Sequence, residues 1–418
     1  MSLERVELFD TRSFIIFLFA VSALALVSLS FEYYQYRTLK TFDDAQIEVR
    51  VSNHYVKTKN EKTYSVLKLY FQGKTLYTTG SKDLKNLRGR TLLIRIWTKK
   101  ISFLDYLKGF YIHSVLLHVK PQLANNEKVS RFIASQHKDI LLQELFGALF
   151  TASPISPQLR EKLSVSGASH LLAISGFHLG ILSLLLLGVL SFPYRFLQER
   201  YFPYRHRHRD LFLITASLLF LYLLFLGSIP SLLRAFMMML VGYVLYDRHI
   251  EVISMQNLGV SVLLLLALWP ALLFSFAFWL SVSGVFYIFV FLQYFDTLKK
   301  YQLLFLIAIW VYMMMLPISL YFFQVFSLWH PLSIVWSILF MPFYVISLGL
   351  HVIGFGGLFD GLLLSMLEDI QGKTVSISLS VLALHVSLSL LAVFSKRALL
   401  LSIISAISIA ILAIYKVA

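Results

Sequence analysis

The sequence contains no cysteine in its 418 residues. This absence excludes a disulfide framework, a catalytic thiol and a zinc site built from thiolates. Charged residues are also scarce: they make up 14% of the chain, against 58% hydrophobic residues. The ATP-binding pattern G-x-x-x-x-G-K-[S/T] does not occur either. Together with a mean hydropathy of +0.74, these features exclude a soluble domain and predict a polytopic α-helical membrane protein.

The formal net charge is +15, and most of the excess lies in one segment. Between Phe31 and Lys138 there are 20 Lys and Arg residues but only 8 Asp and Glu residues. This is the one long stretch that does not resemble a membrane span. It therefore reads as a separate basic domain, covering 31–138, and 139–418 forms the multi-span domain.

Residues 1–30 predict an N-terminal membrane anchor. Ser13 to Ser30 is a continuous apolar run of about the length that crosses a bilayer. Arg5 and Arg12 precede it, which favours a cytoplasmic start and places 31–138 on the extracytoplasmic side. A cleaved signal peptide is the alternative, although the apolar run is long for one.

The basic domain reads as β-structure. Five segments are rich in β-branched and aromatic residues, at 46–56, 63–72, 74–79, 91–97 and 111–119, and Gly73, Gly80 and Gly89 lie between some of them. About five short strands in such a domain predict a small β-barrel of the OB kind. An open five-stranded sheet with a helix is the alternative.

Basic and aromatic side chains alternate through these strands, a combination typical of surfaces that bind single-stranded nucleic acid. A solvated basic surface with its aromatic residues in the core is the competing interpretation. The candidate DNA-binding residues are Lys57, Lys59, Lys68, Lys74, Arg88 and Arg90.

The segment from Ser164 to Gly180 carries more small and polar residues than a lipid-facing helix needs. On one continuous helix, Gly167, Gly176 and Gly180 would contribute to a seam of small residues that allows close helix packing. Polar side chains at membrane depth usually face the protein interior or a water-filled cavity. We therefore expect the segment to border a hydrated path, and the candidate lining or gating residues are His170, Ser175, His178 and Arg234.

The rest of the chain predicts about eight to ten spans in total. Further spans are expected at about 303–323, 332–353, 374–394 and 398–415. The loop 194–210 is short and rich in arginine, so it is expected to be cytoplasmic. Residues 354–369 are amphipathic and are expected at a surface.

Three blocks of sequence resemble the ComEC-type competence proteins. SGASHLLAISGFHLG, residues 166–180, is similar to the signature G-x-S-H-L-L-A-I-S-G-x-H-x-G. PSLLRAFMM at 230–238 is similar to a second block, and 257–284 resembles a third, although Ala277, Phe278 and Trp279 replace its usual Gly-Phe-Gln. The first motif is specific, whereas the other two would be weak alone.

This resemblance implies a multi-pass channel of the bacterial inner membrane that passes single-stranded DNA during natural transformation. Longer members of that family carry a C-terminal metallo-β-lactamase-like domain, and the apolar end of this chain predicts a short form without it. Expected partners are single-stranded DNA, membrane lipids, a periplasmic DNA receptor and a cytosolic ATP-driven helicase or translocase. An oligomer is compatible with this expectation.

Two other classes of function remain open. One is a transporter or flippase for a small anionic solute or lipid, for which a large basic external domain is superfluous. The other is an intramembrane hydrolase that uses Ser175 with His178 as its base. The sequence shows no group to orient that histidine, so we expect no enzyme, no catalytic residue, no cofactor and no metal site.

Overall fold

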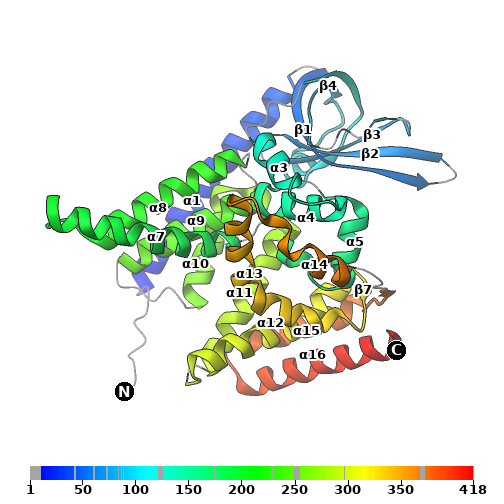
Figure 1. Ribbon diagram of the computed structural model, residues 1–418. Coiled ribbons are helices and arrows are strands. Elements are labelled where there is room, and N and C mark those ends of the chain that lie inside the picture. The colour runs from blue at the N-terminus through cyan, green and yellow to red at the C-terminus, as the bar shows by residue number, and fades with distance from the viewer. Residues whose placement is uncertain are drawn as a thin grey trace. The chain divides into compact units, whose positions relative to one another are not determined.

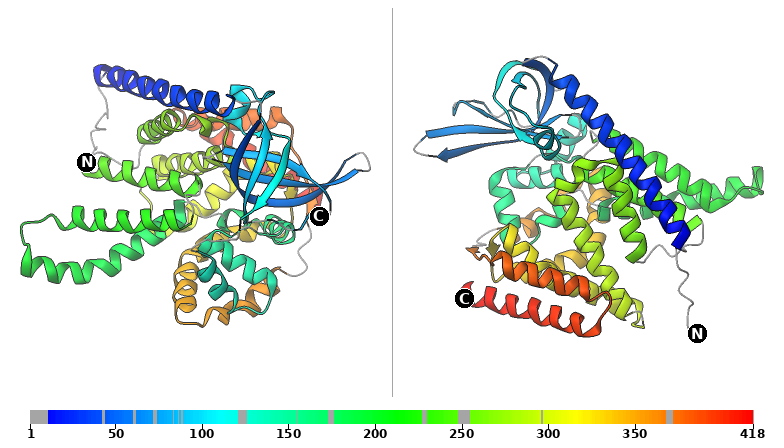
Figure 2. Two further views of the ribbon diagram at one scale, coloured as in Figure 1. Left: turned by 90° about the horizontal axis from the view of Figure 1, so that it is seen from above. Right: turned by 180° about the vertical axis from the view of Figure 1, so that it is seen from behind.

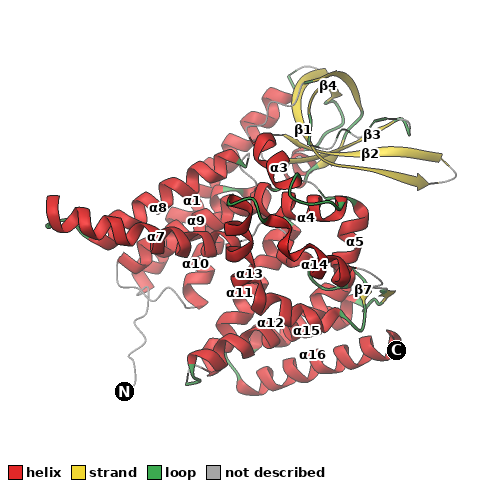
Figure 3. Ribbon diagram, in the orientation of Figure 1, coloured by secondary structure: helices red, strands yellow, loops and turns green. Residues whose placement is uncertain are grey.

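The computed structural model describes residues 11–417 apart from 42–43, 60–61, 72–73, 83, 86, 88, 121–125, 154, 173–175, 227–229, 248–254, 296 and 368–371. The fold is mostly helical and carries one six-stranded sheet (Figures 1 and 3). It divides into two compact units. The first unit comprises Met1–Lys128 and Leu223–Trp279, and the second comprises Val129–Tyr222 and Leu280–Ala418.

The sheet of the first unit has the strand order β5-β3-β2-β1-β4-β6. Only the β3–β5 pair is parallel among its pairings. The strands are β1 (Asp44–Lys59), β2 (Lys62–Phe71), β3 (Lys74–Gly80), β4 (Thr91–Trp97), β5 (Phe110–Tyr111) and β6 (Ser114–Val119). Alternate residues such as Val51, Leu69 and Ile96 are buried on one face, as the period of two predicts.

The sheet is open, so the predicted closed OB-like barrel is not formed. Its edge strands β5 and β6 do not pair with each other in the part of the chain that the structure describes. Only Ile112 and His113 separate these strands, and so short a link spans at most about 11 Å. The sheet therefore curls until its edges approach. The long strand β1 makes this bend possible, because it pairs with β4 before its bulge at Val51/Asn53 and mainly with β2 after it.

The helix α1 (Thr11–Leu39) contains the predicted apolar run and continues without a break into the sheet domain (Figure 2). Its end is fixed there by the buried Tyr36, whose hydroxyl donates to the carbonyl of Ile101 at 2.9 Å. Further back, Ser28 donates to the carbonyl of Leu268 at 2.8 Å, at the end of α10 (Met255–Leu268). The first unit also contains α2 (Phe103–Lys108), α9 (Pro230–Asp247) and the 3-10 helix η1 (Pro270–Phe274).

The second unit is helical. Within it α12, α15 and α16 pack side by side (yellow to red in Figure 1). Its helices are α3 (Asn126–Ala134), α4 (Ile140–Thr151), α5 (Pro157–Val165), α6 (Ser169–Leu172), α7 (Gly176–Tyr201), α8 (Arg207–Phe225), α11 (Phe276–Phe295), α12 (Lys300–Phe322), α13 (Ser333–Val352), α14 (Asp360–Leu367), α15 (Leu379–Leu391) and α16 (Lys396–Val417). Shorter elements are β7 (Val325–Phe326), η2 (His330–Leu332), η3 (Gly356–Phe359) and β8 (Lys373–Thr374).

Seven helices in the described residues are long and apolar enough to cross a membrane. They are α1, α7, α8, α11, α12, α13 and α16. The predicted spans at 303–323, 332–353 and 398–415 coincide with three of them. The predicted span at 374–394 contains only the 13 residues of α15, too few to cross about 30 Å at 1.5 Å per residue.

Candidate functional site

A groove of about 520 Å³ opens on the polar face of the sheet in the first unit. Its walls are four tyrosine rings, one lysine and two smaller side chains: Tyr55, Lys57, Tyr64, Val66, Tyr77, Thr79 and Tyr111. The strand register explains why they meet. Tyr55 faces Val66, Lys57 faces Tyr64 and Tyr77 faces Tyr111 across neighbouring strands. All therefore project from one face, opposite the buried leucines and valines.

The groove combines aromatic faces with positive charge. Lys57 lies in its wall, and the ammonium of Lys68 lies 6.0 Å from the centre of the Tyr77 ring. Burial raises the pKa of Tyr77, and the neighbouring Tyr55 raises it further, so this phenol is neutral near pH 7. A neutral ring beside ammonium groups offers a stacking surface without repelling phosphates.

The predicted DNA-binding residues fall into three groups. Lys57 and Lys68 lie at the groove, and Arg90 is exposed in the loop before β4. Lys59 lies in β1, but its side chain and all of Arg88 are outside the described residues. Lys74 is 5% exposed, and its ammonium binds the carboxylate of Glu32 and lies 4.1 Å from the centre of the Tyr106 ring. Lys74 therefore ties α1 to the sheet, and its contact with DNA stays a prediction.

The motif segment Ser164–Gly180 is not the single continuous helix that the sequence predicted. Its helix α5 ends at Val165, and Gly167 adopts a left-handed conformation with φ +71°. The short helix α6 then begins at Ser169, and α7 begins at Gly176. Glycine is required at this turn, because a Cβ at position 167 would lie 3.0 Å from the carbonyl oxygen of His330.

The predicted seam of glycines on one helix face is therefore not formed. Gly167 permits a turn and close contact with the start of α13, rather than contact between two helix faces. Gly176 is exposed at the start of α7. A Cβ on Gly180 would have no described atom within 4 Å, so this glycine makes no tight contact there.

The two motif histidines have different surroundings. His170 is exposed, and its ring contacts the carbonyl of Gly167 at 2.9 Å through Nδ1 and the hydroxyl of Ser337 at 3.0 Å through Nε2. His178 is 1% exposed, and its ring packs edge-to-face against Phe340 and Tyr344 of α13. His170 is thus oriented by polar contacts, whereas His178 is enclosed by aromatic rings.

The surroundings of the other two candidate lining residues, Ser175 and Arg234, lie outside what the structure describes. Ser175 lies outside the described residues. Arg234 lies in α9, but its side chain is outside what the structure describes. The structure therefore brings His170 and His178 to α13 and leaves the other two positions as predictions.

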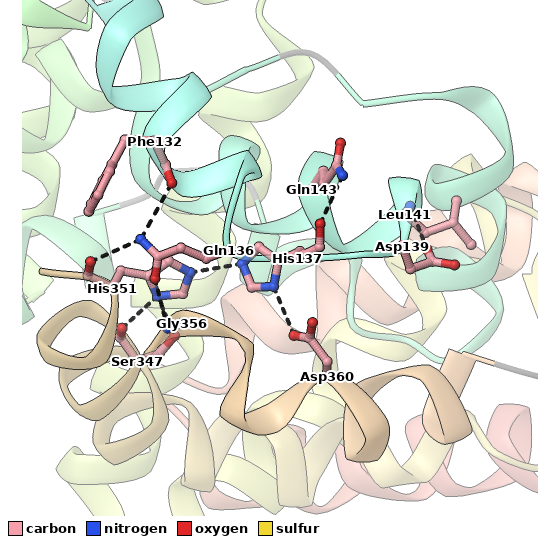
Figure 4. Close-up of polar contacts among 10 residues, drawn as sticks. All are labelled: Phe132, Gln136, His137, Asp139, Leu141, Gln143, Ser347, His351, Gly356 and Asp360. Carbon is pink, nitrogen blue, oxygen red and sulfur yellow. Dashed lines mark hydrogen bonds and ion pairs between the residues drawn. The ribbon is translucent and has the colours of Figure 1, made fainter. Parts of the chain in front are cut away.

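A third histidine site was missed by the sequence analysis. His137, between α3 and α4, contacts His351 near the end of α13 and Asp360 at the start of α14 (Figure 4). Asp360 was expected only as part of an amphipathic surface segment. The signal that was available is the glycine pair Gly356 and Gly357 just before it, since adjacent glycines suggest a close approach of other groups.

Seven candidate spans, a basic sheet with a tyrosine groove and a broken motif helix define a polytopic membrane protein with an appended basic domain. Residues 150–418, more than half of the chain, match the family model described as Competence protein. The chain therefore belongs to this family. No curated protein and no solved structure matches it.

Proposed function

We propose that this protein carries single-stranded DNA across the bacterial cytoplasmic membrane during natural transformation. Membership of the Competence protein family supports a role in DNA uptake. The observation that favours DNA as the ligand is the groove, where four tyrosines and Lys57 share one face of a domain with a large excess of basic residues. A small solute would not need such a surface.

The same groove favours a single strand over a duplex. Tyrosine faces stack on the faces of unpaired bases, and lysines neutralise phosphates with little sequence preference. In a duplex the base faces are covered by neighbouring pairs. In this proposal the domain is extracytoplasmic, collects the strand at Lys57, Lys68, Arg90 and the tyrosines, and passes it to the helical unit.

Within the helical unit, His170 is our first candidate for the DNA path, because it is exposed yet held in one orientation by Gly167 and Ser337. His178 supports the packing of α7 on α13 instead. Ser175 and Arg234 are retained as path residues on the sequence argument alone. No residue is assigned a catalytic role.

The energy for transport is proposed to come from a separate cytosolic translocase. Its docking surface would be the arginine-rich connection between α7 and α8. There Arg205 makes two contacts to Asp210, at 2.6 and 3.1 Å, and Tyr194 donates to the same carboxylate at 2.5 Å. These contacts hold the connection in one shape while other arginines remain at its surface.

Binding to DNA is tested with the full-length protein in lipid nanodiscs, titrated with a labelled oligothymidylate and a labelled duplex at two salt concentrations. The Lys57→Glu variant is compared with Lys99→Glu, which makes the same charge change at an exposed site outside the groove. We expect Lys57→Glu to weaken binding of the single strand and to reduce its log–log salt slope by about 0.7 or more. Equal effects of the two variants would remove the groove from the proposal.

Transport is tested separately in a deletion strain complemented with the chain. Labelled DNA entry and labelled anionic solute or lipid movement are measured side by side. Loss of DNA entry alone on deletion supports the proposal. Loss of solute or lipid movement alone would replace it with the transporter alternative.

A further inference from the structure

In the second unit, four groups form a continuous row from the half-buried carboxylate of Asp360 to a buried backbone carbonyl (Figure 4). Oδ1 of Asp360 lies 2.8 Å from Nδ1 of His137. Nε2 of His137 lies 2.9 Å from Nε2 of His351. Nδ1 of His351 lies 2.7 Å from the carbonyl oxygen of Ser347. The two rings are only 4% and 3% exposed.

The surrounding turn is shaped to hold this row. The side chain of Gln136 donates to the carbonyl of His351 at 3.1 Å and accepts from the N–H of Gly356 at 2.7 Å. A Cβ on Gly356 would lie 2.6 Å from the His351 ring, and one on Gly357 would lie 2.8 Å from the backbone oxygen of Gln136. Only glycine fits at these two positions, so the sequence is suited to the close approach of the two turns.

The hydrogens in this row can be counted. Each of the three contacts needs one hydrogen, and the carbonyl of Ser347 can only accept, so Nδ1 of His351 carries a hydrogen. The contact between the two Nε2 atoms needs a second, and the contact to Asp360 needs a third. Two neutral imidazoles supply only two hydrogens. The geometry therefore requires one proton more than a carboxylate and two neutral rings possess.

His137 is the best position for the extra proton. An imidazolium at His137 donates from both nitrogens, to Asp360 and to His351, so a proton on this ring completes all three contacts. The ring of Phe146 stacks on that of His137 at 4.4 Å with planes 5° apart, and aromatic faces attract cations.

Two carboxylates on the elements next to His137 have partners of their own. Asp139 accepts from the N–H of Leu141, and Glu144 accepts from the N–H of Ser156. Arg131 and Lys138 are exposed. Glu127 and Lys128 lie at the start of α3, and α13 and α14 contribute only His351 and Asp360. Within the described contacts, the charge of His137 is balanced by Asp360.

We propose that His137, His351 and Asp360 form a proton-binding site, and that the bound proton holds the α3–α4 turn against the turn between α13 and α14. When the proton leaves, the two Nε2 lone pairs face each other and the contact between the turns is lost. The held state is therefore present at lower pH and is released as the pH rises. The site therefore sets how firmly the turn between α3 and α4 is held.

The absence of cysteine allows this to be tested with single thiols. Ile133→Cys places a thiol at a buried site in the last turn of α3, and Ser135→Cys places one at an exposed site two residues later. Maleimide labelling of the full-length protein in detergent is followed from about pH 6 to about pH 9. The ratio of the two rates removes the pH dependence of the thiol itself.

We expect the labelling rate at position 133, relative to that at position 135, to rise about tenfold with pH. Loss of one buried hydrogen bond would make opening of the turn more frequent by about this factor. Asp360→Asn keeps the shape, and its amide N–H can supply the third hydrogen to Nδ1 of His137. The row then closes with two neutral rings, so the ratio in this variant should stay low at every pH. A ratio that does not change with pH in the original chain, or the same rise in Asp360→Asn, would overturn the proposal.

A second measurement locates the hydrogens on the His137 ring directly, so it does not depend on whether the two turns separate. In ¹⁵N-histidine spectra of the full-length protein near pH 7, the signals that disappear in His137→Gln identify His137. We expect hydrogens on both of its ring nitrogens. A His137 ring with one unprotonated nitrogen at this pH contradicts the assignment, whatever the labelling shows.

Discussion

The motif residue Gly167 touches the backbone of His330. A Cβ at this position would lie 3.0 Å from the His330 carbonyl oxygen and 3.0 Å from the Cβ of Ser333. Two independent facts therefore require glycine: the left-handed backbone at φ +71° and the absence of space. The family motif thus includes a turn that seats the segment before α6 on the start of α13.

Gly167→Ala is expected to destabilise the helical unit by about 1–2 kcal/mol or more, because the left-handed conformation and the contact with a backbone oxygen both oppose a side chain. Gly180→Ala is the matched control in the same motif. It meets no described atom within 4 Å and lies inside α7, so it should be neutral or stabilise by up to about 1 kcal/mol. Thermal unfolding of both variants in detergent checks the contrast, and equal losses would contradict it.

The helix break shows where sequence patterns reach their limit. The spacing of small residues from Ser166 to Gly180 fits one helical face, so the pattern predicted a continuous helix. In the structure the helix is interrupted at Gly167, which lies against His330 and Ser333, more than 150 residues later. A contact this distant in sequence leaves no local signature beyond the glycine itself.

The sheet and the His137 site illustrate the same limit in different ways. Strand positions followed from alternation, and the predicted strands largely coincide with β1 to β4. Whether the sheet closes depends on whether its edge strands β5 and β6 pair with each other, which alternation does not report. His137 and Asp360 are 223 residues apart, so only the folded chain brings them together.

Lys74→Met is expected to destabilise the first unit by about 3 kcal/mol, because it leaves the carboxylate of Glu32 largely buried without its partner. Replacing both residues, as Lys74→Met with Glu32→Leu, should recover most of this loss, since no buried charge remains. Thermal unfolding of the two single variants and the double variant gives the coupling energy. An additive result would show that the pair does not interact.

The same variants separate structure from DNA binding. Because the Lys74 ammonium faces Glu32 and Tyr106, the folded double variant should bind single-stranded DNA with an unchanged salt slope. A slope reduced as much as in Lys57→Glu would return Lys74 to the DNA-binding surface.

His170→Ala is expected to abolish DNA uptake while the protein remains in the membrane at its normal level, since the substitution removes only two polar contacts of the ring, to Gly167 and Ser337. Ser337→Ala keeps the ring but removes one of its two polar contacts, so a partial loss of uptake is expected. Uptake of labelled DNA in the complemented deletion strain, with membrane levels measured by immunoblot, tests both. Normal uptake in His170→Ala would exclude this residue from the path.

Tyr64→Ala is expected to lower the affinity for a single strand by about 1–3 kcal/mol, or roughly 5- to 150-fold, if its ring stacks on a base. The reason is its position in the wall of the groove, opposite Lys57 on the neighbouring strand. The salt slope should not change, because no positive charge is removed. Tyr64→Phe keeps the aromatic face and should bind nearly as well as the original chain. Titration with oligothymidylate measures all three proteins, and unfolding curves confirm that the sheet is intact. If Phe and Ala weaken binding equally, the hydroxyl rather than the ring face carries the contact, and base stacking in this groove must be abandoned.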